Sequence, residues 1–377
     1  KGRIWLLVAI DVATGMPLAF HLADSQNADD TVELLRRLVS DKSQMAREAG
    51  CEHAPPEPVR PYMIVIDTGS GLWNDVVPRA ILALGACFRY GRVRTPKDKA
   101  VEERYFRTFG GDIMKAVHGY AGEGPGKKTS YDGWEMTSMS KAQLERILWW
   151  YFTDCYPFKK TQRKGGWGVT NGGLFEMTKD RYGKLPALSR RDIRDALGMR
   201  VGTRTVGVMG IEVYRMPYNG TPKFKRWMLD NRGAELTVIV DPYSMEEVTA
   251  FAPDGQRFEL TACLSQFRHF SVAEWLHFLA EWRASDPITK EVSGVALYRF
   301  YERLKDETAR LLKHHGKEHK PIKLEEAERM ADGLAGLNIL VDDGEGSPHA
   351  AIDDALSGSA ESSDGPGVYT PGGEVSD

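Results

Sequence analysis

Two short stretches decide the fold of this chain: VIDTGS at residues 65–70 and VEERYFRTF at residues 101–109. The first ends an apolar run with the carboxylate of Asp67, and the second sets Glu103 at the start of a basic, aromatic segment. Thirty-five residues separate these two carboxylates. Carboxylates brought together from a strand end and a helix can hold divalent ions, because hard cations prefer oxygen ligands.

The residues around these stretches alternate between strand and helix patterns. Apolar runs at 4–10 and 17–23, joined by a turn at 13–16, predict a hairpin. Apolar residues at helical spacing predict a helix over 27–49, with Asn27 or Asp29 as its cap. Further patterns predict strands at 62–66 and 86–90 and helices at 76–84, 101–117 and 140–156. This alternation is typical of a layered α/β domain.

The pattern changes in the second half of the chain. Short strands separated by turns, clearest at 234–240, 248–251 and 257–261, predict an all-β module. A capping box, Ser271 with Glu274, opens a helical region that includes a longer charged helix over about 291–314. The predicted domains are a core at 1–195, a linker at 196–206, a β-module at 207–270, helices at 271–335 and an acidic disordered tail at 336–377.

The charge of the chain is unevenly distributed. Its net charge is −3, but residues 342–377 hold nine acidic residues and no Lys or Arg, so residues 1–341 carry +6. A mildly basic folded part is compatible with a polyanionic partner. The sequence has no apolar run of membrane-spanning length, and its four cysteines lack CxxC spacing, which suits reduced thiols in a cytoplasm.

Residues 1–195 resemble the catalytic core of DDE transposases and retroviral integrases. ERYFRTF at 103–109 is similar to the E-R-x-[FH]-x-T-[LF] helix of that family, and DTGSG at 67–71 is similar to its D-N-G-S-x loop, with Thr68 in place of Asn. Residues 207–262 resemble the β-barrel of bacteriophage Mu-type transposases. The resemblance implies an N-terminally truncated α/β RNase H-like core, followed by a small all-β barrel and C-terminal helices.

The same resemblance implies hydrolysis at a transposon end followed by strand transfer into target DNA. Asp67 and Glu103 would then be ligands of two Mg²⁺ (or Mn²⁺) ions. A structural interpretation stays open, since Asp67 also suits a turn and Glu103 with Arg107 also suits an ordinary surface ion pair. The candidate contacts to DNA phosphates are Lys97, Lys99, Arg104, Arg107, Lys159, Lys160, Arg163 and Lys164.

The first Asp of the family's triad has two candidate positions. The family core opens with three antiparallel strands and carries this Asp on the first of them, whereas only two strands are predicted before the helix at 27. We therefore expect the first strand upstream of Lys1. Asp11, with 55 residues between it and Asp67, is the alternative.

The resemblance also implies partners and a setting. It implies a bacterial or phage-encoded, cytoplasmic and nucleoid-associated protein that works as a homo-oligomer on DNA, without a membrane. By analogy, the C-terminal helices and the tail would recruit an ATPase target-selection protein. Two other functions remain open: a non-catalytic DNA-binding relic or regulator with an incomplete triad, and a structure-specific nuclease on the same fold.

Overall fold

A computed structural model describes residues 4–25, 27–66, 75–91, 106, 109, 140–161, 168–311 and 322–341, with side chains in all these ranges except 305–311. The chain divides into two compact units. Unit 1 consists of Lys1–Gly198 with Gly316–Glu318, and unit 2 consists of Met199–His315 with His319–Asp377. Each unit contains its own hydrophobic core. The two units are described separately below.

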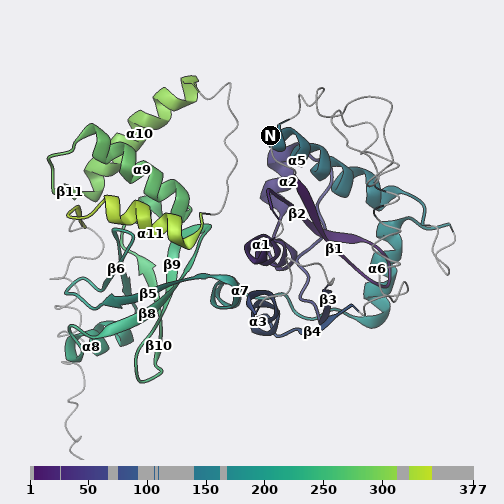
Figure 1. The fold of residues 1–377 in the computed structure, drawn as a ribbon, viewed down its shortest axis with the longest axis horizontal. Helices are drawn as coiled ribbons and strands as arrows, with labels where there is room; N and C mark the ends of the chain where they lie inside the picture. Colours follow the sequence, from purple (N-terminus) through teal and green to yellow (C-terminus); the bar gives the residue numbers. More distant parts are fainter. Residues whose placement is uncertain are drawn as a thin grey trace, which may run out of the picture. The chain divides into compact units, whose positions relative to one another are not determined.

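Unit 1 contains an antiparallel strand pair, a parallel strand pair and six α-helices within its described residues (Figure 1). β1 pairs with β2 in antiparallel register, and β3 pairs with β4 in parallel register. The described elements are β1 (Trp5–Ile10), β2 (Pro17–Ala23), α1 (Ala28–Val39), α2 (Ser43–Ala49), β3 (Met63–Ile66), α3 (Val76–Ala83), β4 (Cys87–Tyr90), α5 (Lys141–Trp150), α6 (Asn171–Tyr182) and α7 (Arg190–Leu197). The predicted hairpin and the two later strands are confirmed.

The helix predicted over 27–49 is two helices. Asn27 caps α1 as predicted, since its side chain accepts a hydrogen bond from the backbone N–H of Asp30. The chain leaves the helix at Ser40, whose backbone is extended. The Asp41 carboxylate then accepts hydrogen bonds from the N–H and hydroxyl of Ser43. This local turn competes with helix continuation and starts α2 in a new direction.

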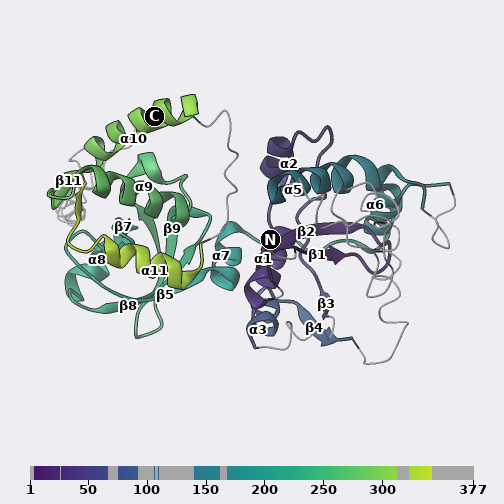
Figure 2. The same ribbon diagram turned by 45° about the horizontal axis from the view of Figure 1, so that its top comes forward.

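The core of unit 1 gathers around β2, on which α1 and α5 both pack (Figure 2). The Phe20 ring lies 4.9 Å from the Trp149 ring and 4.7 Å from the Phe152 ring, measured between centroids. Beyond α5 the chain forms a π-helical turn at Tyr151–Cys155 and a 3₁₀ turn at Tyr156–Phe158. The predicted helix at 140–156 therefore holds as an α-helix only through Trp150, although the capping box at its start is confirmed.

Unit 2 is built on a six-stranded antiparallel sheet in the order β5-β8-β9-β10-β7-β6. The two outermost strands approach each other, so the sheet is nearly closed. Alternate residues point inward: in β10, Phe258, Leu260 and Ala262 are buried and their neighbours are half-buried. The strands are β5 (Met199–Thr205), β6 (Ile211–Val213), β7 (Met216–Gly220), β8 (Glu235–Asp241), β9 (Ser244–Phe251) and β10 (Arg257–Ala262).

Helices and a small second sheet complete unit 2. α8 (Pro222–Asp230) connects β7 to β8, and α9 (Val272–Ser285), α10 (Gly294–Leu311) and α11 (Leu324–Gly333) follow the large sheet. The predicted capping box of Ser271 with Glu274 opens α9. β11 (Glu291–Ser293) and β12 (Asn338–Leu340) form a parallel pair. None of the helices in the described ranges is long and apolar enough to cross a membrane.

Two of the predicted segments contain strands that the sequence did not predict. The linker expected at 196–206 contains the end of α7 and the whole of β5. β5 belongs to the large sheet, and its Val201 faces inward with 1% exposure. At the start of the tail expected at 336–377, residues 338–340 form β12 and Leu337 is completely buried. Residues 342–377 lie outside the described residues.

Candidate active site

The parallel pair β3–β4 leads to the predicted position of Asp67. Ile66, the last residue of β3, is 5% exposed and is aligned with Tyr90 at the end of β4. The N–H of Gly91 donates to the carbonyl of Ile66 at 2.9 Å. Parallel strands end at one edge of a sheet, and binding sites in such sheets form outside their carboxyl ends. Asp67 follows Ile66 directly but lies outside the described residues.

The segment that follows Glu103 is anchored in the core of unit 1. Phe109 is only 3% exposed, and its ring centroid lies 5.5 Å from that of Tyr151 and 6.0 Å from that of Phe152. Phe106 is half-buried against the same core. The predicted site residues Glu103, Lys97, Lys99, Arg104 and Arg107 lie outside the described residues. Phe109 thus contacts the π-helical turn, and Phe106 packs against the same core.

Asp11 has a structural role in the turn between β1 and β2. Its Oδ2 accepts hydrogen bonds from the N–H of Thr14 at 2.8 Å and from the Thr14 hydroxyl at 2.6 Å. Its carbonyl accepts from the N–H of Gly15 at 2.7 Å, and its own N–H donates to Met16. Asp side chains commonly stabilise turns in this way. The geometry accounts for Asp11 without a metal.

The basic residues after α5 differ in whether their side chains are available to contact DNA. The Nζ of Lys159 lies 5.6 Å from the centroid of the Tyr151 ring, a cation–π contact that holds this half-buried side chain at the core. Lys160 is exposed, and its backbone bridges to Thr170. Arg163 and Lys164 lie outside the described residues. Of these four predicted DNA contacts, Lys160 is the one the structure describes with an exposed side chain.

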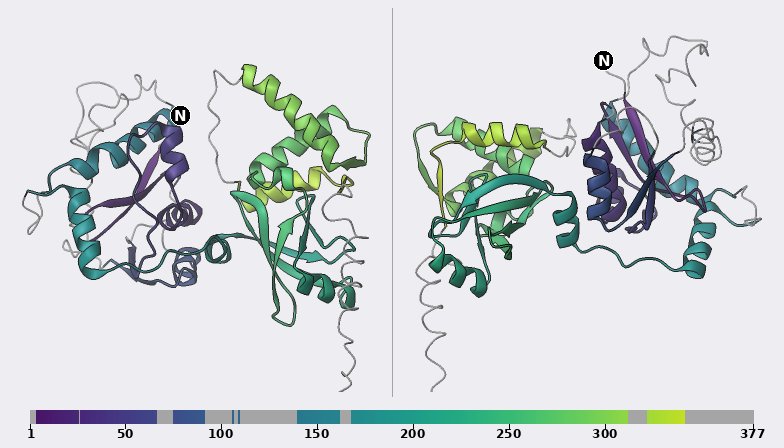
Figure 3. Two further views of the ribbon diagram at one scale, coloured as in Figure 1. Left: turned by 180° about the vertical axis from the view of Figure 1, so that it is seen from behind. Right: turned by 60° about the horizontal axis from the view of Figure 1, so that its bottom comes forward.

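Two other lysines of this region form ion pairs with the same carboxylate. Lys179 of α6 donates to Glu57 at 3.0 Å, and Lys184 also forms an ion pair with Glu57. Hydrogen bonds from Lys184 and Lys179 lower the pKa of the Glu57 carboxyl. Lys184 lies on the extended segment that joins α6 to α7 (Figure 3). These two cations therefore fasten α6 and the segment after it to the loop that holds Glu57.

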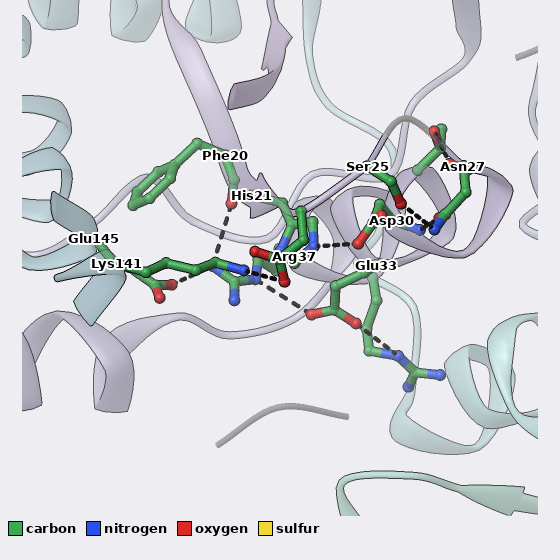
Figure 4. A network of polar contacts seen from close by, with 12 residues as sticks. Phe20, His21, Ser25, Asn27, Asp30, Glu33, Arg37, Lys141 and Glu145 are labelled. Atoms are coloured by element: carbon green, nitrogen blue, oxygen red, sulfur yellow. Dashed lines mark hydrogen bonds and ion pairs between the residues drawn. The ribbon is translucent and has the colours of Figure 1, made fainter. Parts of the chain in front are cut away.

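A polar network beneath β2 was not predicted from the sequence (Figure 4). Arg37 donates to Glu145 of α5 at 2.9 Å, to Glu33 at 3.2 Å and to the carbonyl of Phe20 at 3.3 Å. Glu33 and Arg37 lie one turn apart on the face of α1 opposite the apolar spacing, so the sequence contains no signal for this network. A buried, paired network of this kind connects β2, α1 and α5 rather than carrying chemistry.

The network also contains a histidine. His21 is 8% exposed, and its Nε2 lies 3.0 Å from Oδ1 of Asp30. Burial, together with the positive charge of Arg37, lowers the pKa of His21, against the opposing effect of Asp30. At neutral pH the imidazole is therefore uncharged and acts as a structural hydrogen-bonding group.

The candidate site for divalent ions consists of the predicted pair of carboxylates, Asp67 and Glu103. Among the residues that the structure describes, no three His, Cys, Asp or Glu side chains are grouped closely enough to hold a metal. The chemistry of the predicted donors does fit, because Asp67 and Glu103 offer hard oxygen ligands of the kind Mg²⁺ prefers. The parallel β3–β4 pair directs the chain into the first of them.

Comparison with known families adds a second line of support. Residues 1–119 match the family model described as the TnsB C-terminal domain. The matched range contains Asp67, Glu103 and the strands β1 to β4. The match supports a relationship to a transposase family for this part of the chain. It does not support the more specific expectation of a Mu-type transposase. No curated protein matches the chain.

Proposed function

We propose that this chain is the catalytic part of a DDE-type DNA transposase, which cleaves phosphodiesters at the ends of a mobile element and joins them to target DNA. The observation that carries the proposal is the match of residues 1–119 to a transposase domain over the range that contains both predicted carboxylates. The position of Asp67 directly after a parallel strand supports it further.

We propose an RNase H-like fold for unit 1. In support, an antiparallel pair and a parallel pair follow one another along the chain and contribute to one hydrophobic core, yet they hydrogen-bond as two separate sheets among the described residues. One further strand that hydrogen-bonds to both pairs would join them into a single sheet. A carboxylate on that strand would complete the triad, while Asp11 serves the β1–β2 turn.

Each predicted residue then has a role. Asp67 and Glu103 would hold two Mg²⁺ or Mn²⁺ ions, which supply activation of the attacking oxygen and stabilisation of the leaving oxygen when bound. The basic residues near Glu103 would position DNA phosphates beside them, and the exposed amine of Lys160 would extend this contact. Phe109 would keep the Glu103 segment fixed to the core.

The proposed partners follow from this chemistry. Transposon ends and target DNA are the substrates, and the protein would act as a homo-oligomer assembled on the ends. An ATPase that selects the target would contact the C-terminal region. Sedimentation of the protein with and without end DNA tests the oligomer, which should form on addition of the DNA.

The activity is tested by a strand-joining assay with a labelled duplex that carries the end of the element. Asp67→Asn and Glu103→Gln should each lower the joining rate at least about 100-fold, because loss of a direct metal ligand costs more than loss of its supporting contacts. Asp11→Asn is the matched control and should join DNA at nearly the wild-type rate. Cleavage without joining would indicate a nuclease, and neither reaction in the wild type would indicate a DNA-binding relic.

A further inference from the structure

In unit 2, α8 is a short helix that carries an excess of positive charge. Its residues include Lys223, Lys225 and Arg226 against the single acidic residue Asp230, and Arg232 follows in the next turn. Lys223, Arg226 and Arg232 are exposed, and Lys225 is half-buried. Within the described part of the chain, none of these four cations forms an ion pair or a hydrogen bond through its side chain. They contrast with Lys179 and Lys184, which form ion pairs with a carboxylate.

The helix presents these cations from a fixed position. Phe224 is completely buried and Met228 is 6% exposed, and the ring of Phe224 lies 5.1 Å from that of Phe258 in β10. Gly220, just before the helix, leaves so little space that an added Cβ would lie 2.7 Å from Leu260 and 3.0 Å from Phe224. The apolar face of α8 is therefore seated directly on the sheet, and the opposite face with Lys223 and Arg226 points to solvent.

Acidic residues of unit 2 are found on another helix, α11. α11 carries four acidic residues and one Arg, and it lies away from α8 across the sheet (Figures 1 and 3). These two helices of unit 2 thus carry opposite charge. Exposed, unpaired cations on a rigid helix are suited to a regular polyanion, since binding releases the counterions of the polyanion without breaking internal ion pairs.

We propose that the exposed face of α8 with Lys223 and Arg226, together with Arg232 just after the helix, holds the phosphate backbone of duplex DNA. This inference deepens the proposed function by assigning a DNA contact to unit 2, and it rests on that function for the identity of the polyanion. The contact is independent of sequence, because each cation meets a phosphate and none is directed to a base edge.

The test is the salt dependence of binding to a short labelled duplex of arbitrary sequence, measured by fluorescence anisotropy in EDTA. For the double variant Lys223→Gln/Arg226→Gln, we expect the slope of log Kd against log salt to fall by about 1.8, or about 0.9 for each lost phosphate contact. The matched control is Arg215→Gln/Arg257→Gln, because both of these arginines are already paired, with Glu212 and Glu259. The control should keep the wild-type slope.

An unchanged slope in the double variant, or an equal loss in the control, would overturn the proposal. Circular dichroism of the double variant checks that α8 remains folded, and Lys223→Arg/Arg226→Lys should restore the slope. The assay needs neither metal nor Asp67 and Glu103, so its outcome is separate from that of the joining assay.

Discussion

Lys42 is a lysine buried in aromatic surroundings. Its side chain is almost completely enclosed, with 3% exposure, and it lines a small cavity together with Phe20, Trp149 and Phe152. Its Nζ donates to the carbonyl of Ser40 at 3.3 Å. Burial lowers the pKa of Lys42 to about 8, although the charges of Asp41 and Glu57 oppose this shift. The protonated amine therefore destabilises the folded state.

The sign of the pH dependence follows from that shift. Below pH 8 the amine is protonated in both the folded and the unfolded state, and the folded state bears the whole cost of burying the charge. Between pH 8 and 10.5 the unfolded state binds more protons than the folded state, so the free energy of unfolding rises with pH. We predict that Lys42→Met raises the free energy of unfolding at pH 7 by up to about 3 kcal/mol, and that the difference from wild type vanishes by pH 10.5. Urea titrations at several pH values measure both.

Lys160→Met is the control for this substitution, because Lys160 is exposed and its amine is solvated. It should leave the free energy of unfolding nearly unchanged at every pH. A loss of stability in Lys42→Met at pH 7 would contradict the prediction and would mean that the hydrogen bond of the amine to Ser40 outweighs the cost of its burial.

At the residue scale the sequence predicts local polar contacts well. Asn27, Ser140 and Ser271 all cap helices as expected, because a cap is decided by residues within one turn of chain. The contacts of Arg37 could not be predicted, since its partner Glu145 lies 108 residues away in the sequence. Asp67 and Glu103 remain predictions.

At the element scale, the β6–β7 hairpin shows where sequence patterns fail. Its two-residue turn consists of Tyr214 and Arg215, with φ of 52° and 66°. Such turns favour Asn and Gly, which tolerate positive φ, so the sequence contains no signal for it. Tertiary packing compensates, because Tyr214 is 4% exposed and its carbonyl accepts from the indole of Trp275 at 2.8 Å.

Gly210 immediately precedes β6, and its backbone conformation leads to a prediction at the scale of this element. Its φ is +109°, and an added Cβ would lie 2.0 Å from the carbonyl oxygen of Tyr218 in β7. We predict that Gly210→Ala lowers the free energy of unfolding of unit 2 by at least about 2 kcal/mol, since strain and a backbone clash add together. Thermal unfolding measures this.

Gly207→Ala is the matched control for that substitution. Gly207 lies three residues earlier, its φ is not in the positive range, and an added Cβ would meet its nearest atom at 3.6 Å. This variant should unfold at nearly the wild-type temperature. Equal behaviour of the two alanine variants would show that the β6–β7 register is not fixed by Gly210.

At the scale of the whole molecule, the residues that the structure describes form two hydrophobic cores with no residue in common. One surrounds Phe20, Leu148 and Trp149, and the other surrounds Val238, Leu260 and Trp275. The sequence predicts this division, since the alternating α/β pattern gives way to short strands near residue 200. The predicted linker at 196–206 contains the boundary between the units, but β5 within it was not predicted, because it has the composition of a polar loop, with Arg200, Gly202, Thr203 and Arg204.

We predict that substitutions in one core leave the other core unaffected, because distant sites without shared partners act independently. In hydrogen exchange, Gly210→Ala should increase exchange in β6 to β10 and leave α1 and α5 at wild-type rates. Lys42→Met should slow exchange in α1 and α5 alone. Parallel changes in both units would instead indicate one cooperative folding unit.

Metal ligation by Asp67 is the basis of the proposed function, and replacing its oxygen with sulfur tests it most directly. We would measure strand joining by Asp67→Cys in Mg²⁺ and in Mn²⁺, with Asp67→Ala as the control. A thiolate is a poor ligand for hard Mg²⁺ and a better one for Mn²⁺. We predict that Asp67→Cys is inactive in Mg²⁺ and regains joining in Mn²⁺, while Asp67→Ala is inactive in both. Wild-type joining by Asp67→Ala in Mg²⁺ would contradict the assignment.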